Sequence, residues 1–423
     1  MRAGSPGTRL AHLARALAAP MLLITVITAA LPAASQAAGI AGDRGYLMPQ
    51  VPSGIGVGLT MNYGVQEKAS EVGRIDYVWG ASAPPAPASV YNTAYLKYAR
   101  DQQEVHPLSW WQANHPTWVE YRCGRRKHKP AYQFHHKNVP LDIANPEVLA
   151  YQWQEEIEPR LAEGYAGMAL DNLELTNESG RCGHFDASGN WVQQYTGTSG
   201  DPAFTQSVLE WLSSTREEIH AYSPTATVSI NYSYDPRVSA AANMALMEDA
   251  DLVFDERGVT NWGQTGNDRL APALWLSVYE SAVTLQQEGS CYDLNNEFPG
   301  LSASIPAAEI EWAIANYLLI KGDCTYISIS GFRSKKLNQQ DYGVMHWYPQ
   351  YETAIGEPLG PAAEQPSGAY LREFSGGLAV VNPTLGPAEV TLPAGTWRDG
   401  QGNEMTGSTV LASQQGATLT PAS

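Results

Sequence analysis

Acidic residues follow several apolar, strand-like runs of the sequence, and strand ends are where reactive groups gather in βα barrels. Asp171 comes directly after the run 167–170, and Glu256 comes shortly after the run 252–254. Hydrolysis of an acetal needs two carboxyl groups, one to protonate the leaving oxygen and one to attack or stabilise the anomeric carbon. The sequence therefore predicts Asp171 as nucleophile or base and Glu256 as the acid.

The second carboxylate has alternatives. Glu280 follows the apolar run 273–278 and is a rival acid or a group that binds substrate hydroxyls. Asp255 is a lesser candidate. The competing interpretations are that Asp171 only caps the next helix and that residues 255–257 form a solvated charged loop. No Gly-x-Ser-x-Gly motif supports a serine nucleophile instead.

Aromatic and amide side chains near the predicted strand ends are candidates for substrate binding. Aromatic rings can stack on sugar C–H faces, and amides can bind hydroxyl groups, although any single ring is more often a packing residue. The predicted binding residues are Asn62, Tyr63, Trp79, Trp110, Asn172, Asn231, Tyr232 and Glu280, with Trp111, Trp191 and Trp262 as further aromatic candidates.

Strand-like runs alternate with helical stretches between about residue 54 and residue 351, which is typical of βα units around a parallel sheet. The predicted strands are 56–60, 74–79, 105–110, 167–170, 226–230, 252–254, 273–278 and 324–329, and the predicted helices are 92–101, 146–163, 203–222, 236–248 and 307–320. This order predicts a (β/α)₈ TIM barrel over residues 38–355. A dinucleotide-binding sheet is disfavoured because no Gly-x-Gly-x-x-Gly follows a strand.

The boundaries of two elements have clear local signals. Asn145, Pro146 and Glu147 form a strong helix start, and Gly164 is a suitable helix stop. Residues 356–423 are rich in turns, and their short apolar runs predict a small C-terminal antiparallel β-sandwich-like domain.

The N-terminus resembles a secretion signal. Three arginines precede the apolar run 21–31, and small residues follow at 35–37, so residues 1–37 are predicted to be a signal peptide of a secreted, extracellular protein without a membrane span. An uncleaved N-terminal anchor is the alternative. Two disulfides are expected in an oxidising compartment, and of the three possible connectivities we favour Cys123–Cys182 and Cys291–Cys324.

The amino-acid composition of the chain limits the kinds of ligand that it can bind. The 423 residues are 43% hydrophobic and 16% charged, so the chain can bury a large core. The 43 Asp and Glu outnumber the 26 Lys and Arg, and the formal charge of −17 argues against nucleic acid and favours a neutral or cationic ligand. A carbohydrate fits the surplus of 12 Trp and 22 Tyr over 7 Phe. No cofactor signature and no metal motif are evident, apart from an acidic loop at 186–190 that could hold Ca²⁺.

Two segments carry a family resemblance. Residues 141–147 (LDIANPE) and 164–172 (GYAGMALDN) resemble the approach to the fourth strand of secreted glycosidase-like barrels. Segments 355–360, 378–383 and 392–400 extend the resemblance to a family of uncharacterised glycoside hydrolases. The layout is also similar to that of the endo-α-1,4-polygalactosaminidases, in which an Asp follows strand four and a Glu follows strand six.

The resemblance implies a barrel glycosidase with Asp171 and Glu256 as its two carboxylates. Ala166 departs from the pattern, since these families commonly have Asp there, but the turn before strand four lies away from the active end. A non-catalytic carbohydrate-binding protein on the same scaffold and a structural exoprotein are the alternatives. The catalytic hypothesis requires Glu256 or Glu280 to reach the same cavity as Asp171.

Overall fold

The computed structural model describes most of the chain after the N-terminal segment. The described residues are 47–60, 74–81, 91–98, 106–124, 127–133, 138–263, 269–332 and 346–422, together with the backbone of short strands at 38–40 and 100–102. The predicted signal peptide and two predicted binding residues, Asn62 and Tyr63, lie outside this set. Within it, no helix combines the length and the apolar composition needed to cross a membrane.

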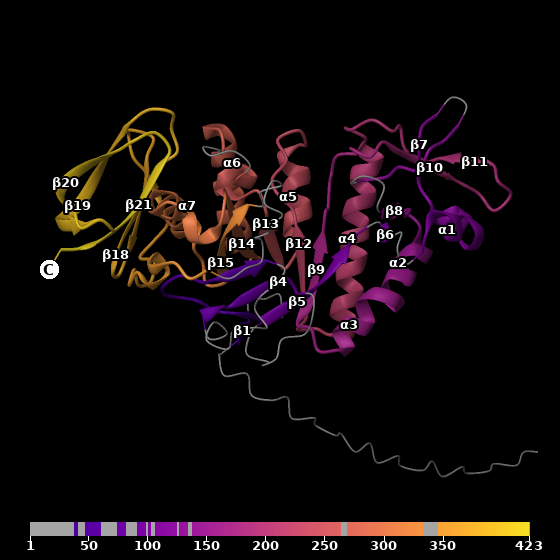
Figure 1. The fold of residues 1–423 in the computed structure, drawn as a ribbon, viewed down its shortest axis with the longest axis horizontal. Helices are drawn as coiled ribbons and strands as arrows, with labels where there is room; N and C mark the ends of the chain where they lie inside the picture. Colours follow the sequence, from indigo (N-terminus) through magenta and orange to yellow (C-terminus); the bar gives the residue numbers. More distant parts are fainter. Residues whose placement is uncertain are drawn as a thin grey trace, which may run out of the picture. The chain divides into compact units, whose positions relative to one another are not determined.

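The central element is a sheet of eight parallel strands that nearly closes into a barrel (Figure 1). Its order is β15-β14-β13-β12-β9-β5-β4-β3. A parallel bridge between Val57 and Ile327, with the Ile327 amide donating to the Gly56 carbonyl at 2.8 Å, joins the two ends of the sheet. The strands are β3 (Gly58–Thr60), β4 (Tyr77–Ala81), β5 (Tyr91–Lys97), β9 (Gly167–Asp171), β12 (Thr227–Asn231), β13 (Leu252–Asp255), β14 (Cys291–Pro299) and β15 (Thr325–Phe332). The predicted barrel class is confirmed.

Three predicted elements are wrong. The expected helix 92–101 is strand β5, because it lies between β4 and β9, where Asn92, Thr93, Ala94 and Leu96 are buried. The expected strand 105–110 gives way to helix α1 (Leu108–Asn114). The expected strand 273–278 is part of helix α6 (Pro272–Gln287), whose buried residues Trp275, Val278, Ala282 and Leu285 recur at helical spacing.

The seventh barrel strand, β14, was not predicted. Its residues Asp293, Asn295, Asn296 and Glu297 are polar, so the run lacks the apolar pattern of a buried parallel strand. All four are nevertheless buried. Asp293, Asn295 and Glu297 share the face of the strand opposite to Leu294, which packs against the helices, so these three side chains face the inside of the barrel. Asn296 is on the other face, where its side chain accepts a hydrogen bond from the Val259 amide at 3.3 Å.

The predicted helices 146–163, 203–222 and 307–320 begin within one residue of their predicted starts, whereas the predicted helix 236–248 begins only at Ala240. The Asn145 side chain accepts a hydrogen bond from the Glu147 amide at 3.0 Å and caps a helical stretch made of α2 (Pro146–Gln152), a π-helical turn (Trp153–Ile157) and α3 (Glu158–Ala162). The other helices are α4 (Pro202–Tyr222), α5 (Ala240–Glu248) and α7 (Ala307–Ile320). They cover the sheet and bury its outer side chains.

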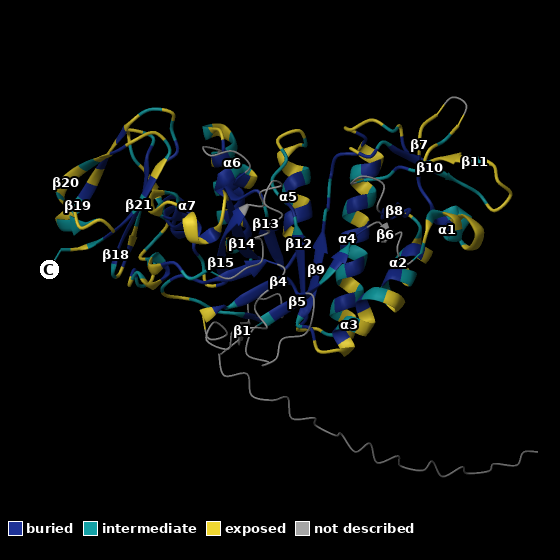
Figure 2. Ribbon diagram, in the orientation of Figure 1, coloured by how far each residue is buried: buried dark blue, intermediate teal, exposed yellow. Residues whose placement is uncertain are grey.

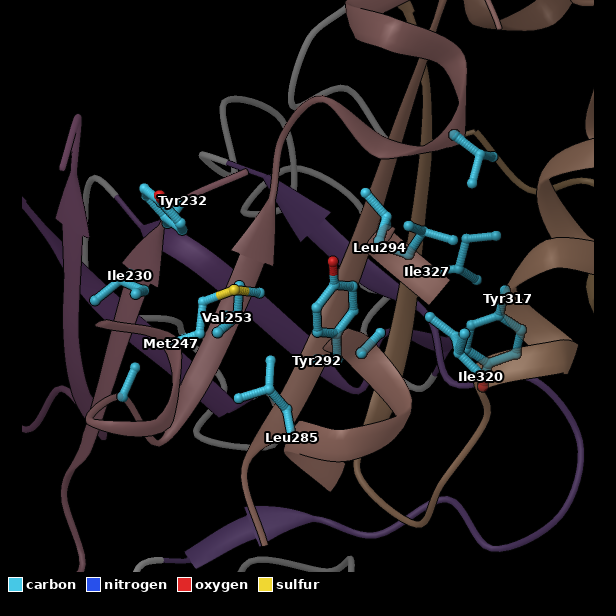
Figure 3. Packing of buried hydrophobic residues seen from close by; sticks show 14 of the residues in the cluster. Ile230, Tyr232, Met247, Val253, Leu285, Tyr292, Leu294, Tyr317, Ile320 and Ile327 are labelled. Atoms are coloured by element: carbon cyan, nitrogen blue, oxygen red, sulfur yellow. The ribbon is translucent and has the colours of Figure 1, made fainter. Parts of the chain in front are cut away.

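Buried residues concentrate in the strands of the barrel (Figure 2), and two clusters of buried side chains form the barrel core. Between strands and helices, Ile230, Val253 and Leu294 pack with Met247 of α5 and Leu285 of α6 in one cluster (Figure 3). A second cluster contains Tyr77, Trp79, Phe254 and Tyr326, with Trp79 stacked on Phe254 at a centroid distance of 4.4 Å. Trp79 was predicted to bind substrate, but it is fully buried in this second cluster and acts as a packing residue.

An insertion on the barrel carries its own small sheet. Strands β7 (Tyr121–Arg122), β10 (Arg181–Phe185) and β11 (Trp191–Gln193) pair in the order β11-β10-β7, and β6 (Arg100–Gln102) pairs with β8 (Asn138–Pro140). Cys123 and Cys182 form one disulfide within the insertion, and Cys291 and Cys324 form the other between the starts of β14 and β15. Both predicted pairings are confirmed.

The C-terminal part is one curled antiparallel sheet of six strands. The order is β16-β17-β18-β21-β19-β20, with β16 (Ala363–Glu364), β17 (Tyr370–Phe374), β18 (Gly377–Asn382), β19 (Ala388–Arg398), β20 (Glu404–Leu411) and β21 (Gln415–Pro421). It packs on α7, and a Cβ at Gly416 would lie 2.8 Å from the Ala315 side chain. Only glycine permits this close approach.

Arg372 of β17 connects this sheet to the barrel. Its Nη1 donates to the carbonyls of Leu318, Leu319 and Lys321 at 2.9, 3.1 and 2.7 Å. These carbonyls belong to the last turn of α7 and the residue after it, where helix carbonyls lack a full set of donors within the helix and where a cation is favoured by the helix dipole. The Lys321 amide also donates to the Leu318 carbonyl, at 3.3 Å. One guanidinium therefore caps a barrel helix from the neighbouring sheet.

We expect Arg372→Ala to lower the free energy of unfolding by about 2 kcal/mol, because it removes charge-assisted hydrogen bonds and leaves carbonyls unpaired. Chemical denaturation followed by fluorescence measures the change. Arg398→Ala is the matched control, since Arg398 pairs with Glu404 at an exposed position and such pairs contribute at most about 1 kcal/mol. Equal losses in the two variants would contradict the capping role.

Candidate active site

A cavity of about 650 Å³ opens at the carboxyl ends of β9, β12 and β13. This volume is in the usual range for small-molecule sites, and the position is where barrel enzymes place their active sites. The lining residues are Asp171, Asn172, Leu173, Glu174, Leu175, Thr176, Glu178, Asn231, Tyr232, Ser233, Asp235, Pro236, Arg237, Glu256, Arg257 and Trp262.

Asp171 is the last residue of β9 and is only 6% exposed. The Asn231 amide, at the end of β12, donates to its Oδ1 at 2.8 Å. The Tyr95 hydroxyl of β5 and the Asn172 amide both donate to its Oδ2. Donors from three strand ends orient the carboxylate and stabilise its negative charge.

Asn172 has a left-handed backbone conformation, with φ of 64°. Asn tolerates this conformation better than most residues. The chain turns sharply out of the strand here, and the Asn172 side chain points back to the carboxylate of Asp171. The turn at Asn172 thus helps to orient the carboxylate of Asp171.

Glu256 follows β13 and faces the same cavity. Its Oε2 accepts a hydrogen bond from Asn231 Nδ2 at 2.8 Å, and the same nitrogen donates to Asp171 Oδ1 at 2.8 Å. Two oxygens that share one nitrogen at these distances lie no more than 5.6 Å apart. The structure therefore brings together the two carboxylates singled out from the sequence.

Asp255, the neighbour of Glu256, is fully buried and does not line the cavity. The Tyr292 hydroxyl donates to its Oδ2 at 2.9 Å, and the Ser233 hydroxyl and the Gly258 amide donate to its Oδ1. These contacts tie the turn after β13 to β14 and to the segment after β12. Asp255 thus anchors the turn that carries Glu256.

Glu297 of β14 is a buried acid that the sequence analysis missed. Burial, together with the negative charge of Glu256, raises the pKa of Glu297 from 4.5 to about 9. The Asn295 amide donates to the Glu256 carbonyl at 3.3 Å and to Glu297 Oε1 at 3.4 Å. At neutral pH Glu297 is protonated, so it places no second negative charge beside Glu256.

The turn 258–263 presents an aromatic ring to the cavity. A Cβ at Gly258 or Gly263 would lie 1.9 Å from a carbonyl oxygen of β14, so both positions require glycine. Between them, Trp262 is held at φ of 62° and remains 39% exposed on the cavity wall. A bulky residue in this conformation is strained, and such strain persists where the surroundings enforce it.

The rim of the cavity carries several charges. Arg237 pairs with Asp235 at 2.8 Å and with Glu178 at 2.5 Å. Arg257 places its guanidinium 5.7 Å from the centroid of the Trp262 ring, a cation–π arrangement. Five carboxylates and two guanidinium groups line the cavity in total, so its surface is polar and predominantly acidic.

The other predicted residues divide between the cavity and the rest of the fold. Tyr232 lines the cavity, and its hydroxyl donates to Asn243 at 2.6 Å. Trp110 lies on α1 in the insertion, stacked on His106 at a centroid distance of 4.1 Å, and Glu280 lies on α6. Neither lines the cavity. Glu280 was placed at a strand end only because α6 was mistaken for a strand.

Within the part of the chain that the structure describes, no group of three or more His, Cys, Asp or Glu side chains could hold a metal ion. In the loop 186–190, the Asp186 carboxylate accepts hydrogen bonds from the Ser188 and Asn190 amides of its own turn. Both of its oxygens take part, since the Asn190 side chain also donates to it at 3.1 Å. The turn is therefore held together by Asp186 itself.

The fold and the paired carboxylates define a glycosyl hydrolase-like barrel. Residues 92–378 match the family described as hypothetical glycosyl hydrolase family 15, and the chain belongs to that family. No curated protein sequence matches the chain.

Solved structures show a related fold at low sequence identity. A trehalulose synthase mutant in complex with Tris has a TM-score of 0.55 and 11% identity, and a family GH13_31 enzyme has a TM-score of 0.52 and 12% identity. Each match covers 87% of this chain and 99% of the other. The glycoside hydrolase domain of PelA from Pseudomonas aeruginosa has a TM-score of 0.41 and 14% identity, covering 65% of this chain and 94% of that domain.

The raised pKa of Glu297 has a consequence for stability. The folded chain retains a proton on Glu297 that the unfolded chain releases, so the free energy of unfolding falls as pH rises from about 4.5 to about 9. One retained proton gives a slope of at most about 1.4 kcal/mol per pH unit. We expect Glu297→Gln to remove this slope, measured by chemical denaturation from pH 4.5 to 9.

Glu389→Gln is the control, because Glu389 is exposed on the C-terminal sheet. Its pH profile should follow that of the parent chain. Parallel profiles for Glu297→Gln and the parent would show that Glu297 is ionised in the folded protein.

Proposed function

We propose that the chain is a secreted glycoside hydrolase that cleaves a polysaccharide or oligosaccharide with net retention at the anomeric carbon. The observation that carries the proposal is the Asn231 amide, which donates to both Asp171 and Glu256 in one cavity. Secretion is supported by the N-terminal arginines and apolar run and by the two disulfides, which persist in oxidising compartments.

Asp171 is the proposed nucleophile. Three donors hold its carboxylate in a fixed orientation, which a group that attacks a carbon atom requires. In the first step Asp171 attacks the anomeric carbon while Glu256 gives its proton to the leaving oxygen. The glycosidic bond breaks and a glycosyl ester forms on Asp171.

Glu256 is the proposed acid and base. In the second step its carboxylate takes a proton from water, and the water oxygen attacks the anomeric carbon and releases Asp171. Carboxyl groups about 5–5.5 Å apart favour this double displacement, whereas about 6.5–9.5 Å leaves room for the water of an inverting enzyme. The limit of 5.6 Å between the two bridged oxygens supports retention.

A non-catalytic carbohydrate-binding protein is the competing function. That function would require only one carboxylate in the cavity together with aromatic rings. Glu256 and Asp171 instead share one amide donor. This arrangement favours catalysis over binding alone.

We expect Glu256→Gln and Asp171→Asn each to reduce kcat by about 10²–10⁴-fold, because each removes a group that acts in the transition state. Reducing-end release from a panel of bacterial and fungal exopolysaccharides measures the activity. Glu280→Gln is the matched control, since Glu280 is an exposed acid on α6 outside the cavity. Parent-level activity in Asp171→Asn would refute the assignment.

The stereochemistry is tested separately. Proton NMR of the first product formed should show the anomer of the substrate linkage. Initial release of the opposite anomer would contradict the double displacement while leaving hydrolysis itself in place.

We expect Trp262→Ala to raise KM about three- to tenfold with a smaller change in kcat, because an aromatic contact contributes about 0.5–1.5 kcal/mol to binding. Initial rates over a range of substrate concentrations separate the two constants. Trp110→Ala is the control, since Trp110 is a tryptophan of the insertion that does not line the cavity. An unchanged KM in Trp262→Ala would rule out the ring as a sugar platform.

A further inference from the structure

A second cavity, of about 520 Å³, lies in the insertion and shares no lining residue with the catalytic cavity. Its walls come from α1, the turn after it, the β7 hairpin and β10, which Figure 1 labels together. The lining residues are Gln112, Pro116, Tyr121, Lys127, His128 and Phe185. We propose that this cavity binds an acidic glycan, a sugar chain that carries carboxylate groups.

Charge is the first observation behind the proposal. The eight residues from 122 to 129 (RCGRRKHK) contain five of the 26 Lys and Arg of a chain whose net charge is −17. Arg125 and Arg126 lie outside the described residues and are not part of the site. Arg122, Lys127 and Lys129 are exposed, and none forms an ion pair with another described residue.

The described residues on either side of positions 125 and 126 are held by their surroundings. Cys123 is bonded to Cys182 of β10, and the Arg122 amide donates to the Lys129 carbonyl at 2.8 Å. A Cβ at Gly124 would lie 2.3 Å from the Lys127 carbonyl oxygen, so glycine is required at position 124. Residues 122–124 and 127–129 therefore lose little backbone entropy when a ligand binds to them.

The cavity combines Lys127 with surfaces suited to a sugar, and Lys129 lies two residues further along the chain. The His128 ring stacks on Trp191 at a centroid distance of 3.6 Å and meets the Phe185 edge at 5.8 Å. The Gln112 amide donates to the Tyr121 hydroxyl at 2.9 Å. Rings offer apolar contact to C–H faces, the amide and hydroxyl suit sugar hydroxyls, and Lys127 suits a carboxylate.

The observations favour a glycan over a nucleic acid. Lys127 is the one lysine or arginine among the described residues that line the cavity, whereas nucleic acids are held mainly by several Lys and Arg contacts to successive phosphates. An acidic glycan has about one carboxylate per sugar, and a local basic patch attracts it within a Debye length of about 8–10 Å.

A residue just beyond the basic segment 122–129 contacts a residue of the catalytic cavity. Gln133, four residues after Lys129, donates a hydrogen bond through its side chain to Glu174, which lines the catalytic cavity. The proposed site is thus linked to the catalytic cavity by one short stretch of chain. Binding at the insertion needs no catalysis, so it can be tested whether or not the proposed hydrolase activity is found.

The experiment measures binding of the full mature chain to polygalacturonate by isothermal titration calorimetry at low salt. We expect saturable binding that weakens as salt increases, and at least about a tenfold loss of affinity in the Lys127→Gln/Lys129→Gln double variant. Arg160→Gln/Arg398→Gln removes the same charge elsewhere on the surface and should bind like the parent. Thermal unfolding of each variant checks that the fold is retained.

Three further measurements separate the sites and the ligands. Asp171→Asn should bind polygalacturonate as the parent chain does. Neutral dextran should bind neither to the parent chain nor to Asp171→Asn. Absence of polygalacturonate binding, or equal binding by the Lys127→Gln/Lys129→Gln variant, would overturn the proposal. Loss of polygalacturonate binding in Asp171→Asn would assign this ligand to the catalytic cavity. Tighter binding of a DNA oligonucleotide than of polygalacturonate would show that the basic segment binds nucleic acid instead.

Discussion

One amide group organises the candidate site. Asn231 lies at the end of β12, between the strand that ends in Asp171 and the strand that ends shortly before Glu256, and its two hydrogens reach one carboxylate on each side. Two carboxylates held this close repel each other, and a hydrogen-bond donor between them offsets part of this repulsion. The order of neighbouring parallel strands β9, β12 and β13 thus determines the spacing on which the proposed chemistry depends.

The polar seventh strand, β14, holds the turn that carries Glu256 in place. Asp255 is anchored by Tyr292 of β14, and Gly258 and Gly263 lie directly against the β14 backbone. The buried side chains of β14 therefore set the path of the turn that carries Glu256 and Trp262. A strand of apolar residues could fill the same space, but it would supply fewer hydrogen-bonding partners to this turn.

The sequence predicted the parts of the fold that follow general patterns. Strands β9, β12, β13 and β15 are short apolar runs with helices after most of them, and these were recognised, along with Asp171 and Glu256 at their ends. Strand β14 was missed because its polar residues serve the site, and β5 was taken for a helix because burial between two strands overrides local propensity. Trp79 was misplaced because a strand pattern does not say which ring faces the packed interior.

The disulfide between Cys291 and Cys324 joins residues that are 33 positions apart, and the loop between them includes α7. It links the last two strands of the barrel, of which β15 carries the bridge from Ile327 to Val57 that joins the ends of the sheet. In the chain-entropy account, closing a loop of this length disfavours the unfolded state by about 3–4 kcal/mol. In a reducing compartment such as the cytosol the disulfide would be lost, and with it this stabilisation of the two strands next to the Val57–Ile327 bridge. Folding after export would therefore suit this architecture.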